Sequence, residues 1–182
     1  EKYPDDLEAQ AFYTLALYGD VRAKKNYEDI EKRISAILAK NPQHPCHHYR
    51  IHLWDYKDAK QALPSVGQCG QSAPGIAHMW HMPGHILSRL KRYNDAAWQM
   101  EASARVDHAH MIRDRVMPDR IHNFAHNNEW LTRNLGHAGR VRHGLAMAKN
   151  MIDLPRLPSV KTNGTWTVST RGSYTYGKRH LH

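Results

Sequence analysis

The chain of 182 residues contains no run of 18 consecutive apolar residues, the length that a membrane-spanning helix requires, and we expect no membrane span. Cysteine is also scarce. Cys46 and Cys69 are the only two, and because they form neither a CxxC pair nor a disulfide framework, they indicate no compartment. Cys46 stands among histidines at the start of an expected helix. There it is either a small half-buried residue, which we favour, or a thiolate ligand.

Several catalytic signatures are missing too. The sequence has no HExxH motif, so the general base of a zinc protease is lacking, and it has neither a GxSxG motif nor a phosphate-binding glycine loop. These absences leave the chain without a recognisable reaction. A metalloenzyme therefore stays the least favoured of three functional interpretations.

The net charge of +9 does not indicate nucleic-acid binding. Residues 161–182 carry 4 of the 26 basic residues and no acidic one, whereas the remaining 22 are interspersed with all 17 acidic residues. A nucleic-acid surface needs a basic stripe or a known motif, and neither is present. We expect no nucleic-acid partner.

Apolar residues recur at helical spacing over most of the chain, which predicts an all-α fold. Helices are expected over residues 5–18, 26–40, 45–56, 58–63, 77–90, 94–106, 119–135 and 140–152. Residues 64–75, rich in Gly, Pro and Ser, are predicted to form a loop, and residues 108–116 a connection or short helix. We expect one helical domain over residues 1–158 and an irregular tail, or a connector to a missing repeat, over residues 159–182.

Residues 77–110 resemble a tetratricopeptide repeat (TPR), a helical hairpin of 34 residues. Trp80, Gly84, Tyr93 and Ala96 match the large and small residues that interlock the two helices of that repeat. The resemblance implies antiparallel helical hairpins stacked as a short TPR-like α-solenoid. It also implies a concave groove, lined by the first helix of each hairpin, that takes a protein or peptide.

The repeat is irregular. Residues corresponding to Tyr93 stand 29, 37 and 48 residues apart along the chain, and Pro83 predicts a kink inside a first helix. The stretch HMWHMPGHILSRLKRY also resembles segments of large multidomain bacterial repeat proteins. Because the chain begins at Glu1 within a helical pattern, we expect it to be a fragment of such a protein.

Histidines recur three or four residues apart at three places. They are His48 and His52, then His78, His81 and His85, then His122 and His126. Residues four apart lie about 40° apart around a helix, so each pair shares one face. Neutral imidazole binds zinc, copper, nickel and iron, and such a pair can hold one ion if another helix completes the site.

The TPR resemblance implies that His78, His81 and His85 face the groove and that the other two pairs lie on neighbouring first helices. We therefore predict a helical-repeat binding scaffold whose groove binds a transition-metal ion, with His81 and His85 as the strongest ligands. Facing imidazoles would otherwise repel when protonated. Three acidic residues are candidates for a carboxylate ligand or for an acceptor that orients a ring: Glu129, Asp107 and Asp119.

The alternative is a metal-free TPR-type interaction module. The histidines would then be hydrogen-bonded packing residues or would contact a bound peptide. By the same resemblance, Asn127 and Asn128 beside Glu129 would bond the peptide backbone in the groove. A metalloenzyme would need more, namely an open coordination position beside a general base.

Overall fold

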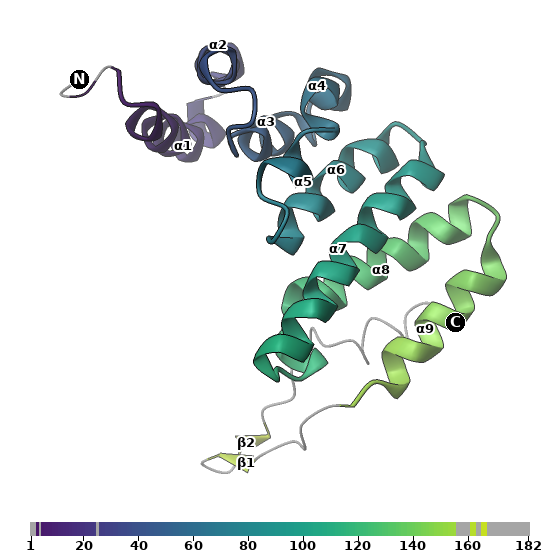
Figure 1. Cartoon of the computed structure of the whole chain (residues 1–182). Coiled ribbons are helices and arrows are strands. Elements are labelled where there is room, and N and C mark those ends of the chain that lie inside the picture. The colour runs from purple at the N-terminus through teal and green to yellow at the C-terminus, as the bar shows by residue number, and fades with distance from the viewer. Residues whose placement is uncertain (1–2, 4, 25, 156–160, 163–164, 167–182) are drawn as a thin grey trace.

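The computed structural model describes residues 3, 5–24, 26–155, 161–162 and 165–166 (Figure 1). In this part the α-helices are α1 (Leu7–Lys24), α2 (Tyr27–Lys40), α3 (His47–Trp54), α4 (Leu63–Val66), α5 (Cys69–Ser72), α6 (Ala77–Arg89), α7 (Tyr93–Asp114), α8 (His122–His137) and α9 (Val141–Asp153). Two short 3-10 helices, η1 (Ala59–Ala62) and η2 (Pro118–Arg120), join them. The prediction of a helical fold is confirmed. No described helix has the length and apolar character needed to cross a bilayer.

Among the described residues, strands occur only in the expected tail. There β1 (Lys161–Thr162) pairs antiparallel with β2 (Thr165–Trp166). The rest of residues 159–182 lies outside the described residues, so the prediction of an irregular connector stays a prediction.

Neighbouring helices pack in chain order. α1 contacts α2, α6 contacts α7, α7 contacts α8 and α8 contacts α9. Figure 1 shows the helices α6 to α9 side by side. Other contacts join helices that are not consecutive in the chain, and among them α6 touches both α3 and α8. The three helices that carry the predicted histidines are therefore spatial neighbours, with α6 in the middle.

The turns after α6 and after α8 share one backbone form. Lys91 and Gly139 have positive φ angles of 60° and 75°. Each is followed by an arginine, Arg92 or Arg140, whose N–H donates to the carbonyl oxygen five residues earlier, in both cases over 2.8 Å. This left-handed helix ending reverses the chain. The α6–α7 and α8–α9 pairs are therefore helical hairpins closed in the same way.

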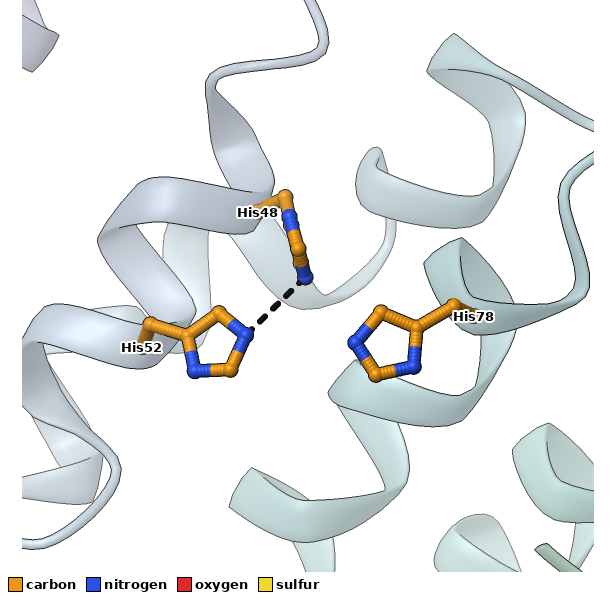
Figure 2. A group of neighbouring side chains, drawn as sticks. All are labelled: His48, His52 and His78. Atoms are coloured by element: carbon orange, nitrogen blue, oxygen red, sulfur yellow. Dashed lines mark hydrogen bonds between the residues drawn. The ribbon is translucent and has the colours of Figure 1, made fainter. Parts of the chain in front are cut away.

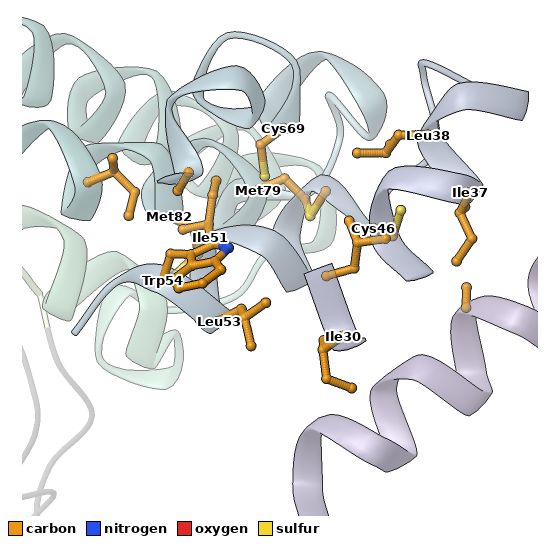
Figure 3. Packing of buried hydrophobic residues seen from close by; sticks show 14 residues of the cluster. Ile30, Ile37, Leu38, Cys46, Ile51, Leu53, Trp54, Cys69, Met79 and Met82 are labelled. Atoms are coloured by element: carbon orange, nitrogen blue, oxygen red, sulfur yellow. The ribbon is translucent and has the colours of Figure 1, made fainter. Parts of the chain in front are cut away.

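The largest apolar core joins α1, α2, α3 and α6 (Figure 3). Its most deeply buried members include Ile30, Ile34, Ile37, Ile51 and Ile86. A smaller core between α7 and α8 contains Ala97, Met100, Leu131 and Leu135. At Gly84 a Cβ atom would collide with the end of the Met100 side chain, so glycine at this position lets α6 and α7 approach closely with Met100 in its present place.

Three predicted boundaries are wrong. α1 continues through Gly19 to Lys24, because one glycine costs a helix only about 1 kcal/mol. α7 runs on to Asp114 and ends at Arg115, whose left-handed backbone (φ 53°) carries no glycine signal. Residues 64–75 contain α4 and α5 rather than a loop, because Pro64 stands in the first turn of α4, where proline is tolerated. The predicted kink at Pro83 does not interrupt α6.

Candidate metal centre

Six of the seven predicted histidines form two groups of three. His48 and His52 of α3 meet His78 of α6, and His81 and His85 of α6 meet His126 of α8. Within each group one possible ligand atom per residue lies within 4.8 Å of the others, so each triad could hold a metal ion. We call them the half-buried triad and the buried triad, after the exposure of their members.

In the buried triad, His81 and His85 are 1% and 7% exposed, and their Nε2 atoms lie 2.8 Å apart. The His126 ring lies 5.0 Å from the His81 ring, centroid to centroid. Zinc–imidazole bonds of about 2.0–2.1 Å place tetrahedral ligand nitrogens roughly 3.3 Å apart. The observed distance between the His81 and His85 Nε2 atoms is close to this spacing, and a side-chain movement of about half an ångström would make room for an ion.

The His81 ring is oriented by Asn127. The Asn127 Nδ2 group donates to the carbonyl oxygen of Met100 over 2.5 Å, which leaves Asn127 Oδ1 3.0 Å from His81 Nδ1. Because that oxygen can only accept, His81 carries its proton on Nδ1. His81 Nε2 then holds a lone pair directed at His85.

The His85 ring is oriented by Asp55, the residue that ends α3. Asp55 Oδ2 lies 3.3 Å from His85 Nδ1, an ionic contact that is not aligned well enough for a full hydrogen bond. Asp55 also pairs with Arg89. Burial alone would raise the pKa of Asp55, but the contacts with His85 and Arg89 lower it, so the carboxylate is ionised. An ionised carboxylate favours a proton on His85 Nδ1 and a lone pair on its Nε2.

Two lone pairs therefore face each other across 2.8 Å. Reversing either tautomer would place a lone pair against the Asn127 amide oxygen or the Asp55 carboxylate. Burial, followed by the nearby His85, lowers the pKa of His81 well below its ordinary value, so His81 is uncharged at neutral pH. A metal ion bound by both Nε2 atoms would remove the opposition of the two lone pairs.

The half-buried triad has a related geometry. His48 Nε2 lies 3.0 Å from His52 Nε2, and the three rings turn nitrogen atoms toward a common point (Figure 2). His78 Nδ1 lies 3.2 Å from Asn123 Oδ1, and Asn123 donates to Asp107 over 2.6 Å. Burial, with smaller contributions from the nearby His52 and His78, lowers the pKa of His48 to about 3. At neutral pH, His48 therefore has the uncharged form that binds metals.

The opposite face of α3 fixes the direction of its histidines. Arg50 pairs with Glu31 over 2.7 Å, and the Trp54 indole N–H donates to the same carboxylate over 2.8 Å. Ile51 is fully buried in the largest core. With these residues facing α2, His48 and His52 are left facing α6.

The structure separates the remaining candidates. Glu129 lies 3.8 Å from His126 Nδ1, and Asp107 reaches His78 only through Asn123. His122 is exposed, stacks on His126 at 5.6 Å and belongs to neither triad. Asp119 lies in η2 and is also outside both triads.

Asn127 and Asn128 do not share a surface. Asn127 contacts His81, whereas Asn128 donates to the Phe124 carbonyl oxygen and lines a hollow of about 570 Å³ between α7, α8 and α9. The two asparagines therefore face different neighbours, and their binding of a peptide backbone in a groove stays a prediction. Adjacent helix positions are rotated by about 100°, which directs the two side chains to different neighbours.

Sequence reasoning missed Asp55 and Asn123. Asp55 is 34 positions from Arg89 in sequence, and no local pattern connects it to the histidines. Asn123 was detectable, because Asn123 and Asn127 repeat the four-residue spacing of His122 and His126 one position further along α8. Polar residues that orient ligands can share the periodicity of the ligands themselves.

Cys46 takes no part in either triad. Its side chain is fully buried in the largest apolar core, and burial raises its pKa to about 12. The thiol is therefore protonated, as the favoured interpretation of a small buried residue requires.

Comparison of the chain with protein-family models and with curated proteins finds no match.

Proposed function

We propose that the protein is a helical-repeat scaffold that binds a transition-metal ion through His81, His85 and His126. The observation that carries this proposal is the 2.8 Å approach of the Nε2 atoms of His81 and His85, each with its other ring nitrogen facing an oxygen. A carboxylate or amide behind each imidazole is the usual support of a histidine–metal bond. A packing role alone does not require two facing lone pairs.

The donor set limits the metal. Imidazole nitrogens suit zinc, copper, nickel and iron, and no thiolate is within the triad to favour softer ions. Three protein ligands leave at least one further coordination position, which the burial of His81 and His85 shields from bulk solvent. The Trp130 ring, 4.2 Å from the His85 ring, forms an apolar wall beside the site.

Repeat geometry supports the scaffold part of the proposal. The α6–α7 and α8–α9 hairpins have the same turn, and each has a glycine at the contact between its two helices, Gly84 against Met100 and Gly144 against Thr132. In a TPR-like solenoid, α3, α6 and α8 are the first helices of successive hairpins. Neighbouring first helices would line one surface, which accounts for histidines from three hairpins lying together.

Metal analysis of protein purified without a metal-affinity column tests the proposal. We expect at least one equivalent of a transition metal, and a lower melting temperature after chelation, because site formation is coupled to folding. The His81→Gln/His85→Gln variant should lose the metal of the buried triad and respond less to chelator.

A matched control is His108→Gln/His143→Gln, which alters two exposed histidines on α7 and α9. It should keep the wild-type metal content and melting temperature. Unchanged metal content in the His81/His85 variant, with helical circular dichroism intact, would refute the proposed ligands.

A metal-free interaction module is the second candidate. The hollow between α7, α8 and α9 favours it, because Trp98 beside it is 60% exposed and Leu131 and Leu135 line its wall. This function predicts that chelation leaves the melting temperature unchanged and that a peptide ligand protects Trp98 from fluorescence quenchers.

A further inference from the structure

We propose that His48, His52 and His78 bind a second transition-metal ion, so that the protein holds a two-metal centre. This inference rests on the function proposed above, because it adds an ion beside the one in the buried triad. The His48 and His52 Nε2 atoms are 3.0 Å apart on one helix face, and His78 completes the triad from α6 (Figure 2).

The His78 ring is prepared for this role by its neighbours. Asn123 Nδ2 donates to Asp107 over 2.6 Å, so Asn123 Oδ1 faces His78 Nδ1 and fixes the proton there. The nitrogen left for an ion is Nε2. The same arrangement occurs at His81, whose Nδ1 faces the Oδ1 atom of Asn127.

The two sites are adjacent on α6. The His78 and His81 rings stack with centroids 5.6 Å apart and an interplanar angle of 22°. His48 in turn lies 5.1 Å from His78, and His81 lies 5.0 Å from His126, so the rings of both triads form one continuous series. Two ions, one in each triad, would therefore be close neighbours.

Acidic residues behind the rings offset the charge of two ions. Asp55 contacts His85, Glu129 lies beside His126 and Asp107 connects to His78 through Asn123. Neutral imidazoles alone would leave two divalent ions without compensation. Each triad therefore has a carboxylate nearby, which either contacts a histidine directly or reaches it through one intervening residue.

The two ions would differ in access. All three members of the half-buried triad are partly exposed to solvent, whereas His81 and His85 are buried. An ion in the half-buried triad therefore has an open position that water reaches. A small anion such as azide should bind there in place of water, and this ion should be the first one removed by a chelator.

Loading of the metal-free protein with cobalt(II) tests the pair. The wild type should bind two equivalents, and azide should change its visible spectrum. The His48→Gln/His52→Gln variant should bind one equivalent with no azide response, and the His81→Gln/His85→Gln variant one equivalent with the response kept. Circular dichroism of each metal-free variant checks that it is folded.

The outcomes separate this inference from the proposed function. One equivalent that persists without His48 and His52 but disappears without His81 and His85 would overturn the second site and keep the buried one. One equivalent with the opposite dependence would refute the buried site and the two-metal centre. No cobalt bound to the folded wild type would overturn both.

Discussion

Asp55 Oδ2 lies 3.3 Å from His85 Nδ1, and the same carboxylate pairs with Arg89. The contact joins the end of α3 to the middle of α6, 30 positions apart in sequence. It fixes which nitrogen of His85 is protonated and supplies negative charge behind a predicted ligand. An arrangement of carboxylate, histidine and metal is a common support for bound ions.

Replacing this carboxylate should weaken metal binding. In Asp55→Asn, His85 loses its charged acceptor, and we expect the affinity for zinc to fall about 10- to 100-fold. The free energy of unfolding of the metal-free protein should fall by about 1–3 kcal/mol, because Arg89 also loses its partner. Competition against a fluorescent zinc indicator and urea denaturation measure the two effects.

Asp95→Asn is the control for that experiment. It removes an exposed carboxylate paired with Arg92 over 2.7 Å, away from both triads. Exposed ion pairs contribute about 0–1 kcal/mol, and zinc affinity should not change. Equal zinc affinities of Asp55→Asn and wild type would contradict the role assigned to Asp55.

Asn127 should matter through His81 rather than through packing. Asn127→Leu keeps a similar volume but removes the oxygen that holds His81 Nδ1, so we expect zinc affinity to drop about 10- to 100-fold. The matched control is Asn134→Leu, a buried asparagine on the same helix whose amide bonds to the Trp130 carbonyl oxygen. If both variants lost affinity equally, a general disturbance of α8 would explain the effect.

The metal-free protein should lose stability in mild acid. The pKa of His48 is about 3 in the folded chain against 6.5 for an exposed histidine, because burial disfavours the charged ring. The unfolded chain therefore binds more protons below pH 6.5, and the stability present above that pH declines as pH falls toward 3. At pH 5 this one group costs about 1–2 kcal/mol.

Urea denaturation of metal-free protein at pH 7.5 and pH 5.0 measures this effect. His48→Gln removes the titrating group, so its loss of stability between the two pH values should be smaller than that of the wild type by about 1–2 kcal/mol. Identical losses in the two proteins would show that His48 is already solvated in the folded state.

The packing of the short helices before α6 can be tested at two glycines. A Cβ atom at Gly70 would collide with the Trp80 ring, so Gly70→Ala should destabilise the fold by about 1–3 kcal/mol. Gly67, three positions earlier, has open space and a helical φ of −77°, so Gly67→Ala should be neutral or slightly stabilising. Thermal denaturation compares them, and equal melting temperatures would contradict the Gly70–Trp80 contact.

Much of the fold followed from local patterns. The apolar spacing in α2, α6 and α9 predicted these helices to within one residue at each end, because their buried faces repeat every turn. α7 was predicted too short, since its buried residues after Val106, Asp107 and Met111, include a charged one that binds Asn123. Only tertiary structure shows that such a position is interior.

For the candidate site too, local spacing predicted part of the arrangement and the packing between helices determined the rest. Four-residue spacing predicted that His81 and His85 share a face, and this holds because the spacing is a property of any helix. Which histidines meet across helices could not be obtained in this way. The partition into two triads depends on how far α3 and α8 are displaced along α6, which the packing of Ile51 and the bond from Asn127 to Met100 help to set.

Crystals of the zinc-loaded protein would show whether the buried triad binds metal, by anomalous difference maps on either side of the zinc absorption edge. We predict a peak within about 2.0–2.1 Å of the Nε2 atoms of His81 and His85, with His126 as third ligand. This prediction would be contradicted if zinc at saturating concentration appeared only at exposed histidines such as His108 and His143, with no peak at the buried triad.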